Sequence, residues 1–217
     1  MKLEGKKINF LGDSITYGVG TSCENKNFVS VFEKISGSIT RNYGISGTRI
    51  APQRVKSQEE SFDMYFAGRV SKMNPDADVV VVFGGTNDYG HGDAPLGNFS
   101  DRNEKTFYGA MHHLCRTLLE TFPTSVIVFL TPLHRLGENN YLNENGIRNQ
   151  APLYRYVEII KEVTRYYALP TLDLYSVSGI QPEVEVVRKL YMPDGLHPND
   201  KGAELIAKRL YGYLKSL

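Results

Sequence analysis

The sequence predicts an α/β protein built around a parallel β-sheet. Short apolar runs alternate with helical patterns from one end of the chain to the other, as expected where each strand returns to its sheet through a helix. Two of the runs, residues 78–83 (DVVVVF) and 125–130 (SVIVFL), are apolar at successive positions, which is typical of central strands covered on both faces. A chain of 217 residues can fold around one core, so we expect residues 1–217 to form a single domain.

The expected strands are short apolar runs, each followed by Gly, Thr-Pro or a similar strand breaker. They are expected at residues 7–11, 38–43, 78–83, 125–130 and 170–174.

The expected helices carry apolar residues at helical spacing. They are expected at residues 28–35, 62–73, 106–122, 152–167 and 200–214. Pro152 suits the first position of its helix. Either Asn199 or Asp200 is suited to cap the last helix, because both residue types accept hydrogen bonds from the free N–H groups there.

The charge balance argues against a nucleic-acid partner. Lys and Arg number 25 and Asp and Glu 24, for a formal net charge of +1, whereas binding to phosphate backbones needs a basic excess gathered on one face. No apolar run is long enough to span a membrane. We expect no nucleic-acid or membrane partner, and the oligomeric state is left open.

The N-terminal segment and the cysteines suggest a cytoplasmic protein. Residues 1–8 lead into a short strand without the apolar region and cleavage site of a signal peptide. Cys23 and Cys115 lie far apart and have no metal-ligand spacing. We therefore expect two free thiols, no bound metal and no cofactor.

Gly12-Asp13-Ser14 directly follows the first expected strand. A serine there would stand at the carboxyl edge of the sheet, where a nucleophile can reach a substrate. Asp and Ser also cap helices, so the tripeptide alone fits an ordinary turn equally well. Asp13 is expected to support this turn or to cap the helix rather than to act in the chemistry.

Asp194 and His197 lie three residues apart in DGLHP. This spacing lets both side chains emerge on the same side of one compact turn, where the carboxylate can orient the imidazole. Pro198 restricts His197 to an extended conformation. The alternative is a histidine that merely bonds to a neighbouring carboxylate.

Two further motifs follow the second and third expected strands. Asn87 in GGTND can offer two amide N–H donors, and Gly47 in GISGT allows a backbone N–H to approach a ligand closely. Each fits a plain turn when taken alone. All four motifs, however, follow strands whose carboxyl ends should share one edge, where ligands of such sheets bind.

With these four motifs, the chain resembles the SGNH hydrolases, a family named for a Ser, a Gly, an Asn and a His in separate blocks. Ser14 in GDSITYG, Gly47, Asn87 in GTND and His197 in DGLHP match these blocks in order, with Ile15 where many members have Leu. The resemblance spans nearly the whole chain. It implies a flavodoxin-like three-layer α/β/α sandwich whose central five-stranded parallel sheet has the order 2-1-3-4-5.

The motifs together predict a serine esterase. Ser14 would be the nucleophile, His197 its general base and Asp194 the residue that orients the histidine, giving an acyl-enzyme. The resemblance implies an oxyanion hole formed by the backbone N–H groups of Ser14 and Gly47 and by the side chain of Asn87.

The substrate is expected to be a short-chain ester, with acetylated carbohydrate as the leading hypothesis. The long loop at residues 134–150 is polar, which favours a hydrophilic alcohol, although it could be a simple surface loop. The polar side chains behind this hypothesis are those of Asn139, Asn140, Tyr141, Asn143 and Asn145. Further candidates for the pocket lining are Arg49, Tyr89, His91 and His134, each of which fits ordinary loop surface equally well.

Two other functions are compatible with parts of the sequence. A two-metal phosphoesterase also begins with a strand and Gly-Asp, but it needs more ligands than the motifs supply. A non-catalytic flavodoxin-like module could hold a nucleotide or flavin, although Gly18 and Gly20 give only part of a phosphate-binding motif.

Overall fold

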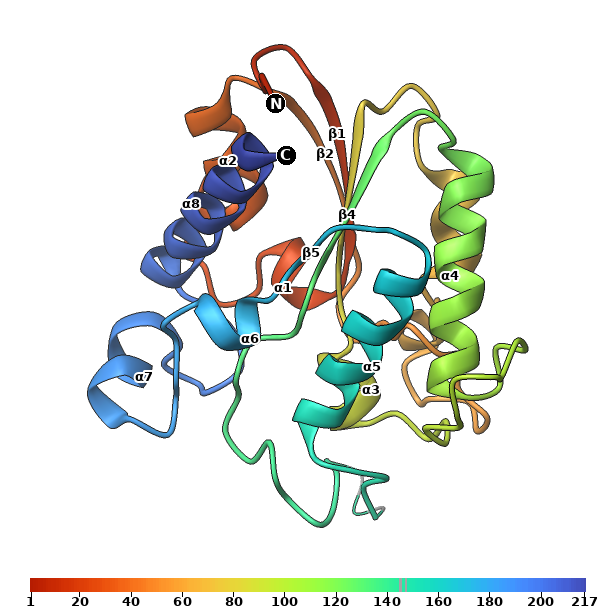
Figure 1. Cartoon of the computed structure of the whole chain (residues 1–217). Helices are drawn as coiled ribbons and strands as arrows, with labels where there is room; N and C mark the ends of the chain where they lie inside the picture. The colour runs from red at the N-terminus through yellow and green to blue at the C-terminus, as the bar shows by residue number, and fades with distance from the viewer. Residues whose placement is uncertain (145, 147) are drawn as a thin grey trace.

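The centre of the fold is a parallel β-sheet that carries every motif at one edge. The computed structural model describes all residues except 145 and 147, and the described residues form a five-stranded sheet of order β2-β1-β3-β4-β5 (Figure 1). Its strands are β1 (Lys7–Gly12), β2 (Ile39–Gly44), β3 (Val79–Phe83), β4 (Val126–Leu130) and β5 (Thr171–Leu172). The neighbouring strands pair in parallel. The expected fold class and strand order are confirmed.

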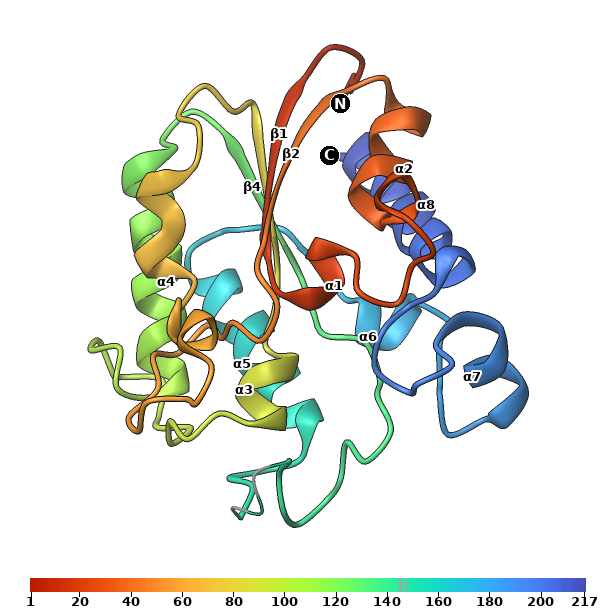
Figure 2. The ribbon, with the colours of Figure 1, turned by 180° about the vertical axis from the view of Figure 1, so that it is seen from behind.

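Helices cover both faces of the sheet, which makes three layers (Figures 1 and 2). One face is covered by α2 (Phe28–Ser36) and α8 (Asp200–Ser216), and the other by α4 (Phe107–Thr121) and α5 (Leu153–Tyr166). The remaining short elements are α1 (Ser14–Tyr17), η1 (Glu24–Lys26), η2 (Glu60–Asp63), η3 (Ala67–Lys72), α3 (Thr86–Gly90), α6 (Leu174–Val177) and α7 (Glu185–Tyr191).

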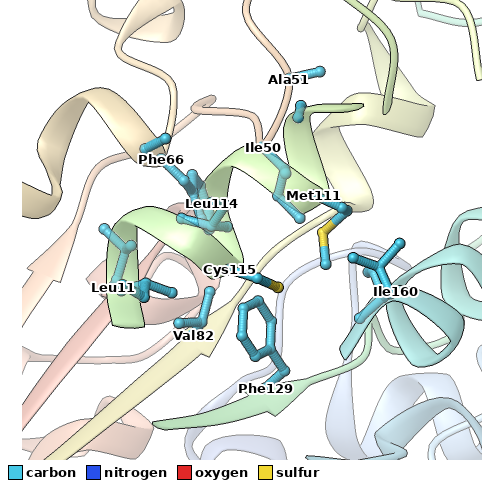
Figure 3. Close-up of a cluster of buried hydrophobic side chains, with 14 of the residues drawn as sticks. Leu11, Ile50, Ala51, Phe66, Val82, Met111, Leu114, Cys115, Phe129 and Ile160 are labelled. Carbon is cyan, nitrogen blue, oxygen red and sulfur yellow. The ribbon is translucent and has the colours of Figure 1, made fainter. Parts of the chain in front are cut away.

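Alternation along the strands fills a core on each side of the sheet. Phe10 of β1 points to the α2 side, where its ring packs edge-to-face on Phe28 and Phe32, with ring centroids 5.7 and 5.6 Å apart. Leu11 points to the other side and packs with Cys115 of α4 among the side chains shown in Figure 3. Residues in β3 and β4 are apolar at successive positions because these strands are covered on both faces.

Two expected elements differ from the structure. The expected helix at residues 62–73 is instead two short 3₁₀ helices, η2 and η3. Asp63 binds Arg49 and Ser57 through its carboxylate, and Phe66 donates its N–H to the Arg49 carbonyl, so these residues are held by partners outside any helix. β5 is shorter than expected because Asp173 caps α6 with its side chain and turns the chain out of the sheet.

The helix caps refine the expected boundaries. Asn199 caps α8 by accepting from Lys201 N and Gly202 N, each at 3.1 Å. Pro152 is the N-cap of α5 rather than its first residue, and the helix begins at Leu153.

The strand register places the carboxyl ends level with one another. Gly12 at the end of β1 is paired with Gly44 of β2 and Phe83 of β3, and Phe83 is paired with Leu130 of β4. The segments that follow these strands therefore meet at one edge. Glycine is required at position 44, because a Cβ there would lie 2.3 Å from the backbone nitrogen of Tyr17.

In the described part of the chain, no helix is both long and apolar enough to cross a lipid bilayer. Both cysteines are free, as expected: Cys23 is exposed and Cys115 is buried.

Candidate active site

Ser14 stands at the sharp turn between β1 and α1. Asp13 caps this short helix by accepting a hydrogen bond from Ile15 N at 3.0 Å, which is the supporting role expected for it. Ser14 is the first residue of the helix, and only 7% of its surface is exposed. The serine is thus held rigidly at the carboxyl edge of the sheet.

A chain of hydrogen bonds links Ser14, His197 and Asp194. Ser14 Oγ lies 3.1 Å from His197 Nε2, and His197 Nδ1 lies 2.7 Å from Asp194 Oδ2. Because a carboxylate only accepts, Nδ1 carries the hydrogen and Nε2 is left to accept from the serine hydroxyl. This geometry lets the imidazole take a proton from Ser14 while the carboxylate fixes the tautomer of the ring.

The turn from Asp194 to His197 is held by its own backbone. Asp194 Oδ1 accepts from His197 N at 2.7 Å and from Leu196 N at 2.9 Å, and Gly195 has a φ of +79°, a conformation that favours glycine. Partial burial raises the pKa of Asp194, but the hydrogen bonds it accepts outweigh this and hold the pKa below its ordinary value of 3.8. The carboxylate therefore stays ionised beside the histidine.

Gly47 and Asn87 come together near the serine turn, since Thr48 contacts both Asn87 and Gly12. The Asn87 amide donates to the carbonyl of Thr48, the residue after Gly47, at 3.0 Å. A primary amide has two N–H groups, so this bond uses only one of them. Gly47 has a φ of +73°, and the ring of Phe62 occupies the space where a Cβ would be. The candidate residues of the serine, glycine, asparagine and histidine motifs thus converge at one site.

Asp88 was not singled out from the sequence, yet it shapes this site. Its buried carboxylate accepts from Ile50 N at 3.0 Å and from Ala51 N at 2.8 Å, so it holds the segment that follows Gly47. Burial raises the pKa of Asp88 to about 6. Its position in GGTND, next to Asn87, was the available sequence signal.

A cleft of about 710 Å³ opens beside Gly47. It is lined by residues 53–59 with Phe62, His91, Asp93 and Glu144, and the Phe62 ring forms the contact between the cleft and Gly47. His91 lines this cleft, whereas Ser14, Asp194 and His197 do not. Most of the lining residues are polar, although Val55 and Phe62 contribute apolar surface.

Arg49 lies behind this cleft rather than in its lining. It is 2% exposed, and its guanidinium donates to Asp63 at 2.8 Å and to His91 Nδ1 at 2.6 Å. Since arginine can only donate, His91 Nδ1 must accept, and the ring is uncharged. Burial and the charge of Arg49 lower the pKa of His91 to about 4. Arg49, which lies two residues after Gly47, therefore connects its own loop by hydrogen bonds to Asp63 and to His91 in the cleft lining.

The loop at residues 134–150 joins two parts of the site. Leu136 N donates to Gly195 O at 2.8 Å in the histidine turn. On the opposite side, the Tyr89 hydroxyl donates to Gly137 O and accepts from Asn140 N. Tyr89 and this loop thus have a bridging role. Asn145, which supported the carbohydrate hypothesis, lies outside the described residues.

His134 is not joined to the triad residues by the hydrogen bonds it makes. Its Nδ1 lies 2.9 Å from Glu138 Oε1, and its ring packs on Tyr175 with centroids 3.7 Å apart. His112 and His113 lie within α4.

A serine, a histidine and a carboxylate joined in this order form an arrangement that serine hydrolases of unrelated folds share. The family model for the GDSL-like lipase/acylhydrolase family matches residues 10–205. The chain belongs to this GDSL-like family of lipases and acylhydrolases.

Individual proteins are also similar to this chain in sequence or fold. A multidomain esterase from Ruminococcus flavefaciens is 26% identical over 246 aligned residues; the match covers 97% of this chain and 29% of that relative. A solved structure from Lactobacillus plantarum is 31% identical over 99% of this chain and 98% of its own, with a TM-score of 0.82. A GDSL-like protein from Bacteroides uniformis shares the fold, with a TM-score of 0.70, 20% identity and coverage of 98% and 97%.

The buried carboxyl of Asp13 predicts a specific pH dependence of stability. Burial, together with the nearby charge of Asp88, raises the pKa of Asp13 to about 7 from 3.8. Between these values the folded state binds a proton that the unfolded state does not, so stability falls as pH rises through about 7. Asp13→Asn keeps the acceptor for Ile15 N and removes this titration.

The free energy of unfolding of wild type should fall between pH 5 and pH 8 because of Asp13, whereas that of Asp13→Asn should not. We therefore expect the stability of Asp13→Asn minus that of wild type to increase by roughly 2 kcal/mol over this range. Urea denaturation at both pH values measures the change. Glu183→Gln, at an exposed position, is the matched control and should remain parallel to wild type. A difference between Asp13→Asn and wild type that is the same at both pH values would contradict the account.

Proposed function

We propose that the chain is a serine esterase that forms an acyl-enzyme on Ser14, with residues 1–217 acting as one catalytic domain. The observation that carries this proposal is the hydrogen-bond chain from Ser14 Oγ through His197 to Asp194. His197 is the general base, and Asp194 orients it and stabilises the imidazolium that forms.

The reaction proceeds in two steps. In the first, Ser14 Oγ attacks the ester carbonyl while His197 Nε2 accepts the serine proton and then passes it to the leaving alcohol. In the second, a water molecule attacks the acyl carbon while His197 accepts one of its protons; the bond from the acyl carbon to Ser14 Oγ then breaks, His197 returns the proton to Ser14 Oγ, and the acid is released. The negative charge on the carbonyl oxygen in each step is met by the N–H groups of Ser14 and Gly47 and by the Asn87 amide.

The proposed substrates are short-chain esters, with acetylated carbohydrates as the leading class. The cleft beside Gly47 supports this choice because exposed polar side chains line it, among them those of Arg54, Lys56, Gln58 and Glu59. Positive and negative groups are both present, which suits a neutral, hydroxylated ligand better than a fatty chain. The relative from Ruminococcus flavefaciens is itself named an esterase.

The serine mechanism predicts the effect of removing the nucleophile. We expect the hydrolysis rate of p-nitrophenyl acetate to fall by roughly 10³-fold or more in Ser14→Ala, and EDTA to leave the wild-type rate unchanged. Ser30→Ala, on helix α2, is the matched control and should behave as wild type.

Activity that survives in Ser14→Ala, or that disappears with EDTA, would contradict the serine mechanism and favour the metal-dependent phosphoesterase. Among residues 1–144, 146 and 148–217, no three His, Cys, Asp or Glu side chains are grouped so that they could hold a metal ion. Inactive wild-type protein with flavin absorbance would instead favour the non-catalytic binding module.

The polar cleft predicts a preference for short acyl chains. In a series of p-nitrophenyl esters from acetyl to decanoyl, we expect kcat/KM to be greatest for acetyl or propionyl and to fall with length, since a longer chain would meet polar side chains. A steady rise of kcat/KM toward decanoyl would refute the short-chain hypothesis while leaving the serine mechanism intact.

A further inference from the structure

Arg69 is a buried arginine that contacts both the segment before Ser14 and the loop that contains Gly47. It lies on η3, where the sequence predicted only a helix, and it is 4% exposed. Its guanidinium stacks over the ring of Phe66, with Cζ 5.0 Å from the centroid. Burial lowers its pKa to about 10, so the side chain is charged at neutral pH. A charge in such a place needs strong acceptors.

The acceptors are backbone groups of the site itself. Nη1 donates to Tyr43 O at 2.7 Å, at the end of β2. Nη2 lies 3.0 Å from both Gly12 O and Thr48 Oγ1. Gly12 precedes the Asp13-Ser14 turn and Thr48 follows Gly47, so one planar group contacts the nucleophile turn and the loop of the proposed oxyanion hole.

The Gly12 carbonyl is the point where these two segments meet. It accepts from Ile45 N at 3.1 Å as well as from Arg69. The position of this peptide fixes where the next residues begin, and thus where Ser14 stands. The Asn87 amide donates to the Thr48 carbonyl at 3.0 Å. Arg69 and Asn87 therefore both position Thr48, the residue after Gly47.

We propose that Arg69 is a positioning residue for ester hydrolysis, which fixes the distance between the serine nucleophile and the N–H donors of the oxyanion hole. The inference rests on the proposed function, because it assumes the roles given above to Ser14, Gly47 and Asn87. A displacement of about 1 Å between reacting groups can lower the rate roughly 100-fold. Loss of the hydrogen bonds from Arg69 to Gly12 and Thr48 should therefore affect kcat more than KM.

The test uses Arg69→Met, which keeps much of the stem and loses the donors, and Arg69→Lys, which keeps the charge and one donor group. With p-nitrophenyl acetate, we expect kcat to fall about 10- to 100-fold in Arg69→Met, with KM changed less than about threefold and a partial recovery in Arg69→Lys. If Arg69→Met does not fold, the lysine variant alone must show a reduced kcat.

A double-mutant cycle with Asn87→Ala separates positioning from general stability. Asn87→Ala alone is expected to lower kcat about 100- to 1000-fold, as for one lost oxyanion donor. Both residues hold Thr48, so their effects should overlap. An Arg69 substitution should therefore lower kcat by a factor that is at least about threefold smaller in the Asn87→Ala protein than in wild type.

His112→Ala is the control for loss of stability. This histidine is 1% exposed and packs against Tyr167, just beyond the end of α5. It should lower Tm and leave kcat within about twofold of wild type.

The inference is overturned if the Arg69 variants keep the wild-type kcat, or if their effect multiplies fully with that of Asn87→Ala. These results differ from a failure of the proposed function. If Ser14→Ala is as active as wild type, the serine mechanism fails; if Ser14→Ala is inactive while Arg69→Met and Arg69→Lys are fully active, only the role of Arg69 fails.

Discussion

The level carboxyl ends of the parallel strands are the constraint on which this site depends. Pairing Gly12 with Gly44 and with Phe83 brings the turns after β1, β2 and β3 to one place. The histidine turn reaches the same edge from near the end of the chain, and the bond between Ser14 and His197 joins residues 183 positions apart. A shift of one residue in register would turn side chains to the opposite face and separate these groups.

Buried polar groups convert this convergence into a fixed geometry. Asp88 holds the backbone of Ile50 and Ala51, Asn87 holds Thr48, and Arg69 connects Thr48 with Gly12. Removing such groups from water is costly unless they find partners. In this site the partners are mostly backbone atoms, so the free energy that these bonds contribute also keeps the turns in place. The raised pKa values of Asp13 and Asp88 reflect the cost of this burial.

Much of the fold was predictable because local signals agreed with the tertiary structure. The apolar runs at β3 and β4 predicted central strands, and the structure places them there. Ser14, Gly47 and Asn87 could be chosen because their motifs follow strands, as expected. The turn with Asp194 and His197 instead follows α7, with α6 and α7 between it and β5, yet the structure brings it to the same site. Their catalytic roles remain a prediction.

The missed features depend on contacts between distant residues. The segment at 62–73 has helical spacing, but bonds from Arg49 to Asp63 override it. Arg69 carries no local signal, since a lone arginine on an expected helix usually faces solvent. The contact between Arg49 and His91 joins positions 42 residues apart. Such partners emerge only from packing of η2 and η3 against the ends of β1 and β2.

The central claim is that Ser14 becomes covalently bound during the reaction. The most direct measurement is to treat the protein with a fluorophosphonate, which reacts with activated serines, and to map the adduct by mass spectrometry. The account predicts one adduct, on Ser14, formed far more slowly in His197→Ala because the serine then lacks its base. An adduct on another residue, or labelling of Ser14 at an equal rate in His197→Ala, would contradict it.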